Sequence, residues 1–73
     1  MFENKEVAVE ISKLMLDIGA KLDQSLELVQ AKEGAKEFER YRAVVATLMG
    51  EMLLEVMNPL YEKHPELKPA GLS

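Results

Sequence analysis

Residues 43–60 read AVVATLMGEMLLEVMNPL, and every other part of the chain can be placed around this segment. Its side chains follow the spacing of an α-helix, in which positions three and four apart share a face. Two apolar faces result, and only a narrow polar strip separates them. A helix that is apolar around most of its circumference is normally buried around most of it. This helix therefore needs neighbours on two sides.

The two apolar faces differ in the size of their side chains. The broad face carries large ones: Phe38, Tyr41, Val45, Leu48, Met49, Met52 and Val56. The second face, called here the small-residue arc, carries Ala43, Ala46, Gly50, Leu53, Leu54 and Met57. Small side chains let two helix backbones approach closely, so the arc is a candidate contact with another helix.

A membrane span is not expected from this segment. Glu51 and Glu55 interrupt the apolar run, which is shorter than the roughly 20 residues that cross a bilayer. Each carboxylate would cost several kcal/mol near the bilayer centre. The segment is predicted to be buried in protein.

Composition points to self-association. The chain has 73 residues, 48% of them hydrophobic, and no cysteine. A domain of this size buries only about 60% of its unfolded surface, so association with a second copy is the expected additional stabiliser. The net charge of −4 argues against a nucleic-acid partner, which favours a basic surface. The opening residues MFENKE do not resemble a signal peptide, so a cytoplasmic location is expected.

A first amphipathic helix is predicted over residues 5–31. Asn4 is a suitable N-cap, because its side chain can accept a hydrogen bond from a free N–H group of the first turn. One apolar stripe then continues through the segment: Val7, Ile11, Leu14, Met15, Ile18, Leu22, Leu26 and Val29. A stripe of this width is typical of a helix with one buried face.

The chain should turn back on itself near Gly34. Val29 and Phe38 are nine residues apart, so on one straight helix their stripes would face opposite ways. A turn with Gly34 in the left-handed conformation lets the stripes face each other. The second helix is predicted over residues 36–57, with a break or kink at Asn58-Pro59. A short helix over 59–63 and an extended tail over 64–73 follow.

The predicted fold is all-α: a two-helix antiparallel hairpin in one domain, which dimerises into a four-helix bundle. The second helices would pair through the small-residue arc. The predicted dimer interface comprises Ala43, Ala46, Thr47, Gly50, Leu53, Leu54 and Met57, with Arg40 of one chain between Glu51 and Glu55 of the other.

Catalytic patterns are not found in the sequence, so no enzyme activity or cofactor is expected. An alternative is a small-molecule or metal site near Glu51, Met52 and Glu55, since helix-borne carboxylates build such sites in bundles. Metal sites of this kind also need histidines, and the sole histidine lies in the tail. The C-terminal segment 58–73 offers possible contacts to another protein through Tyr61, His64, Leu67 and Leu72. The interpretation is a small cytoplasmic, homodimeric interaction or regulatory module.

Overall fold

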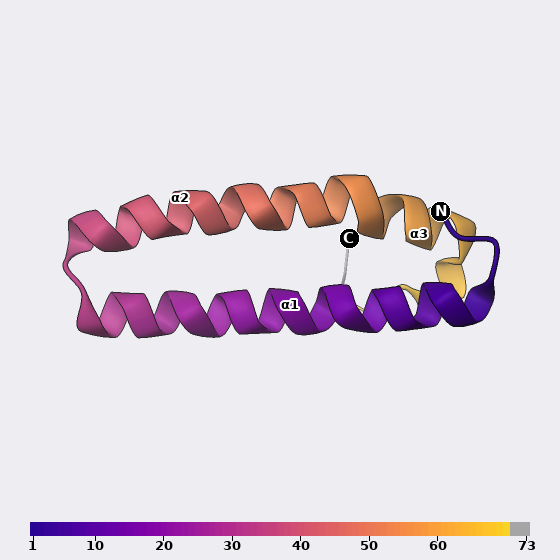
Figure 1. Ribbon diagram of the computed structural model, residues 1–73, viewed down its shortest axis with the longest axis horizontal. Helices are drawn as coiled ribbons and strands as arrows, with labels where there is room; N and C mark the ends of the chain where they lie inside the picture. Colours follow the sequence, from indigo (N-terminus) through magenta and orange to yellow (C-terminus); the bar gives the residue numbers. More distant parts are fainter. Residues whose placement is uncertain (71–73) are drawn as a thin grey trace.

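The structure is a computed structural model that describes residues 1–70. Figure 1 shows two long helical arms that run antiparallel. The first arm is α1, Lys5–Lys32. The second arm is made of three consecutive elements: α2 (Ala35–Glu51), the π-helix η1 (Met52–Met57) and α3 (Asn58–Lys63). The predicted all-α hairpin is confirmed, and no strand occurs within the described residues.

The start of α1 follows the predicted capping arrangement. The Asn4 side chain accepts a hydrogen bond from the Val7 N–H at 3.2 Å, which satisfies one of the free donors of the first turn. Further along, the Ser25 hydroxyl donates to the Leu22 carbonyl at 2.7 Å and lies 2.6 Å from the Tyr41 hydroxyl. The second contact joins the two arms directly.

The turn between the arms differs from the predicted one. Gly34 has φ −73° and ψ 165°, which is extended backbone, and it is the N-cap of α2. The predicted left-handed glycine is therefore wrong. The connection consists of Glu33 and Gly34 alone, and the Glu33 N–H closes α1 by donating to the Val29 carbonyl. Two extended residues suffice to reverse the chain because both helices end close together (Figure 1).

The sequence predicts a break or kink at Asn58-Pro59, and the structure shows no break there. Asn58 is helical, with φ −60° and ψ −50°, and its N–H donates to the carbonyl of Leu53, five residues back. Pro59 has no N–H, and in a regular α-helix its ring would meet the carbonyl of Glu55. The wider π-helix just before the proline shifts that carbonyl, so the helix continues without a break.

The hydrophobic core lies near the end of the hairpin that holds the N-terminus and α3. Ala8, Met57, Leu60 and Tyr61 form one buried cluster, and Ala8 and Leu60 have no exposed surface. Partly buried side chains surround it: Phe2, Ile11, Met15, Leu53 and Leu67. Towards the turn, Val45 is the one further buried hydrophobic residue among those described. The hairpin is therefore tightly packed at one end and thinly covered along the rest of its 45 Å length.

The tail is more ordered than the predicted extended segment. Pro65–Leu67 form a short 3-10 helix, η2, and Leu67 packs on the core cluster. The His64 ring lies beside the residues that precede α1, with its Nε2 2.8 Å from the Phe2 carbonyl oxygen. Phe2 itself has φ 66°, a left-handed conformation that is uncommon for a bulky residue. These contacts fold the tail back onto the start of α1.

Candidate interaction surface

One side of the hairpin exposes a row of large apolar side chains, called here the open face. It consists of Val7, Leu14 and Leu28 on α1 and Val44 and Leu48 on α2. Leu14 and Leu48 each expose about half of their surface, 48% and 49%. Exposed apolar side chains in such a row typically mark a site of contact with another protein.

Helical periodicity places these five residues on one face. Val7, Leu14 and Leu28 are separated by multiples of seven, and Leu28 is three residues after Ser25. Val44 is three residues after Tyr41, and Leu48 is seven after it. The Ser25 and Tyr41 hydroxyls contact each other between the two arms. The row on α1 and the row on α2 therefore lie on the same side of the hairpin.

The tail and α3 pack on the side of α1 that lies opposite the open face. Lys5 contacts Glu66 with an Nζ–Oε1 distance of 3.6 Å, and Ser12 contacts the Tyr61 hydroxyl. Lys5 is two positions before Val7, and Ser12 is two positions before Leu14. Two positions correspond to a rotation of about 200° around a helix, so these contacts lie on the side away from the open face. The tail up to Ala70 therefore leaves the open face uncovered.

The predicted dimer interface is only partly available at the surface. Arg40, Ala43, Ala46, Thr47, Glu51, Leu54 and Glu55 are exposed, and Gly50 and Leu53 are half-buried. Met57 is buried in the core of its own chain, so its assignment to the interface is corrected. The exposed part of the small-residue arc lies on the outer side of α2, and within residues 1–70 neither glutamate forms an ion pair.

Gly50 offers a prediction on this outer side. A Cβ built on Gly50 meets no atom within 4 Å, and glycine inside a helix costs about 0.5–1 kcal/mol relative to alanine. Gly50→Ala should therefore raise the free energy of unfolding by about that amount, measured by urea denaturation. Ala46→Gly, at an exposed position one turn earlier, is the matched control and should lower stability by a similar amount. A destabilising Gly50→Ala would show that another backbone packs closely there.

The tail residues predicted as partner contacts mostly face inward. Tyr61 and His64 are buried, with 5% and 8% of their surfaces exposed. The Tyr61 hydroxyl lies 2.5 Å from the Ser12 hydroxyl, and His64 contacts Phe2. These two side chains join elements of one chain, so their assignment as exposed partner contacts is corrected. Leu67 is half-buried on the core, and Leu72 lies outside the described residues.

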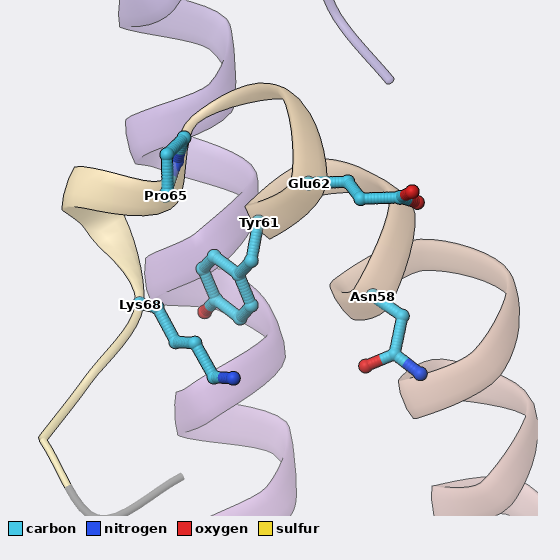
Figure 2. Close-up of a pocket in the computed structure, with 5 residues that line it drawn as sticks. All are labelled: Asn58, Tyr61, Glu62, Pro65 and Lys68. Carbon is cyan, nitrogen blue, oxygen red and sulfur yellow. The ribbon is translucent and has the colours of Figure 1, made fainter. Parts of the chain in front are cut away.

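Two surface hollows lie near this end of the molecule. Figure 2 shows one of them, with the Tyr61 ring pointing towards α1 and Lys68 reaching past it. Its lining residues are Asn58, Tyr61, Glu62, Pro65 and Lys68. The other is lined by residues of the first two turns of α1: Lys5, Glu6, Val9 and Glu10. Neither hollow includes a residue of the open face.

Glu66 makes the tail contacts dependent on pH. Its pKa is lowered, mainly by a hydrogen bond from its own backbone N–H, and the charge of the nearby Lys5 ammonium adds to the effect. A carboxyl whose pKa is lower in the folded state stabilises the fold above its unfolded pKa, and this contribution is lost as the pH falls through the folded value.

Glu66→Gln should therefore lower the urea midpoint at pH 7, and the gap to the unmodified chain should close on acidification below the pKa of an ordinary glutamate. The effect is small because the carboxylate is exposed. Glu62→Gln, on the neighbouring α3, is the matched control for the loss of one exposed carboxylate from this end of the molecule. A gap that widens in acid would contradict the assignment.

The residues of the alternative binding site do not converge. Glu51 and Glu55 are exposed and Met52 is half-buried. Among residues 1–70, no group of three histidine, aspartate or glutamate side chains is arranged to hold a metal ion. The geometry therefore adds no support for a metal site at these positions.

The second arm has the dimensions of a membrane helix. Ala35–Lys63 forms a 29-residue helical path, and it contains an 18-residue window apolar enough to cross a bilayer, of which 17% is buried. The expectation that this segment is too short is therefore wrong, because the helix continues through Pro59. Length and composition alone are weak indications, since core helices of soluble proteins pass the same test. The low burial does show that little of this helix is covered by its own chain.

Comparison of the chain with models of protein families, with curated proteins and with solved structures finds no match.

Proposed function

We propose that the protein is a small cytoplasmic module that functions through protein–protein contact, as a homodimer whose two hairpins form a four-helix bundle. The observation that carries this proposal is an imbalance between buried and exposed apolar side chains. In residues 1–70, five hydrophobic residues are buried, whereas eight large ones expose between 40% and 63% of their surface. A core of that size is small for a chain that has no cysteine and in which residues 1–70 hold no cluster of metal-ligating side chains.

The surface area supports a second copy as the partner. The chain exposes 5373 Å², whereas a compact monomer of 8.2 kDa exposes about 4,500 Å². The surplus of roughly 800 Å² is similar to the area that each partner buries in a standard protein–protein interface. A bundle of two hairpins would cover this surplus.

Insertion into a membrane would cover the long second arm as well. Glu51 and Glu55 favour the soluble dimer, because each carboxylate at the bilayer centre would cost at least about 2.5 kcal/mol. In an aqueous dimer both carboxylates can stay at the edge of the interface. The dimer is therefore the proposal, and membrane binding is an outcome that its test must distinguish.

Sedimentation equilibrium over a wide concentration range, without detergent, tests the proposal. We expect a mass of about twice the 8.2 kDa of the chain. A monomer at all concentrations would refute self-association. Flotation with neutral and with anionic lipid vesicles is the second arm of the test, and comigration of the protein with either vesicle would replace the dimer with membrane binding.

A further inference from the structure

The charged residues along the open face are arranged in a pattern. On α1, positions 7, 14, 21 and 28 carry Val, Leu, Lys and Leu, a seven-residue spacing that keeps one row facing a neighbouring helix. On the second arm, Glu51 ends α2 three residues after Leu48, and Glu55 lies four residues further on, in η1. The face thus holds Lys21 in one half, where its Nζ lies 3.1 Å from Asp17 of the same helix. The other half holds two carboxylates that form no ion pair within residues 1–70.

Two contacts set the register between the arms. The Ser25 and Tyr41 hydroxyls lie 2.6 Å apart, and a Cβ on Gly19 would lie 4.0 Å from the Met49 side chain. In an antiparallel pair of helices, each step towards the N-terminus of α1 corresponds to a step towards the C-terminus of the second arm. Leu14 therefore lies opposite the residues between Glu51 and Glu55 along the hairpin. The row on α1 is symmetric about its midpoint, since Val7 and Leu28, and Leu14 and Lys21, are equally far from it.

We propose that a second copy of the chain docks on the open face, with the two hairpins antiparallel. A two-fold axis at the midpoint of the row brings Lys21 of one copy to the level of Leu14 of the other. Lys21, which also pairs with Asp17 of its own chain, then lies beside Glu51 and Glu55 of that other copy. It brings a positive charge to two carboxylates that form no ion pair among residues 1–70 of their own chain. Val7 meets Leu28 in the same arrangement.

This inference rests on the proposed homodimer and specifies which surface forms it. The surplus area of the monomer is what one partner in a stable dimer buries. The open face supplies large apolar side chains to fill that area. The outer side of the second arm, by contrast, offers mainly small side chains on α2, with Leu54 on η1 as its one large exposed apolar residue within residues 1–70. The docking of α1 against α1 also gives four helices in contact, as a bundle requires.

Single substitutions on the two surfaces test the inference by sedimentation equilibrium. Leu14→Asp and Leu48→Asp place a carboxylate in the proposed interface, and each should raise the dimer dissociation constant about 100-fold or more. Leu54→Asp makes the same chemical change on the outer side of the second arm. It should leave the dimer dissociation constant within about threefold of that of the unmodified chain. Circular dichroism of each variant checks that the helices persist. Dissociation by Leu54→Asp alone would overturn the inference in favour of the small-residue arc.

A charge exchange tests the antiparallel register. Lys21→Glu should weaken the dimer about fivefold or more, and Glu51→Lys with Glu55→Lys in the same chain should restore it. A dimer unaffected by Lys21→Glu, or not restored by the exchange, overturns this register. If the unmodified chain is a monomer, the proposed function itself fails; if it is a dimer that Leu14→Asp and Leu48→Asp leave intact, only the open-face assignment fails.

Discussion

Leu60→Ala should lower the free energy of unfolding by about 2–5 kcal/mol. The Leu60 side chain has no exposed surface and packs against Ala8, Met57 and Tyr61. Its truncation removes buried apolar surface and leaves a cavity that the surrounding helices fill only in part. A domain of this size has only about 5 kcal/mol of stability in total, so the truncation removes a large part of it. Urea denaturation followed by circular dichroism, at one fixed protein concentration, measures the change.

Leu54→Ala is the matched control for this prediction. Leu54 lies on the same helical arm, loses the same atoms, and exposes 63% of its surface. Its truncation should change stability by no more than about 0.5 kcal/mol. Equal losses at Leu54 and Leu60 would mean that the outer side of the second arm is buried, and that the core is not where the structure places it.

Tyr61→Phe should destabilise the protein by about 1–3 kcal/mol. The Tyr61 hydroxyl and the Ser12 hydroxyl form a buried hydrogen bond of 2.5 Å between α3 and α1. Removal of the tyrosine oxygen leaves the Ser12 hydroxyl, which is 5% exposed, without this partner. A buried hydroxyl without a hydrogen bond loses its solvation with no compensation.

The double variant distinguishes the hydrogen bond from simple loss of packing. Ser12→Ala alone should also destabilise the fold, because it leaves the tyrosine hydroxyl unpaired. With both changes together, the loss should be smaller than the sum of the single losses by at least about 0.5 kcal/mol. Strict additivity would show that the two hydroxyls do not contribute as a pair. Tyr41→Phe is a comparison at the partly buried Ser25 contact, where water can replace the lost partner.

The hairpin itself could be predicted from the sequence because its main signals are periodic. The apolar row on α1 and the phase difference between Val29 and Phe38 are properties of helix geometry alone. The conformation of Gly34 could not be obtained in the same way. Glycine permits both left-handed and extended backbone, and the short connection between the helix ends selects the extended one.

The buried residues near the C-terminal end were assigned less well, for a specific reason. A constant helical period places Met57 on the outer arc, and the predicted break leaves Tyr61 in a short separate helix and His64 in an extended tail. The π-helix Met52–Met57 adds about one residue to a turn, so the residues that follow it are rotated with respect to the α2 pattern. Met57, Leu60, Tyr61 and His64 then follow the i, i+3, i+4, i+7 spacing on the side that faces α1.

A proline within an apolar helical run was the available signal for this rotation. Asn58-Pro59 was interpreted as the start of a separate helix, which Asn and Pro at these positions often mark. The same pair is compatible with a π-helix that absorbs the missing donor of the proline. The single-sequence pattern does not separate the two, because the choice depends on whether Leu60 and Tyr61 find partners on α1.

The π-helix also gives the chain one position at which its length can change. A turn with one additional residue is equivalent to a one-residue insertion in a regular helix. Loss of one residue from Leu53–Glu55 would return the second arm to regular geometry, and Leu60 and Tyr61 would still face α1. Pro59 would then again lack room for its ring, so the deletion requires replacement of the proline as well. The additional residue in the π-helix and the proline at position 59 are therefore coupled, so that a change in one requires a change in the other.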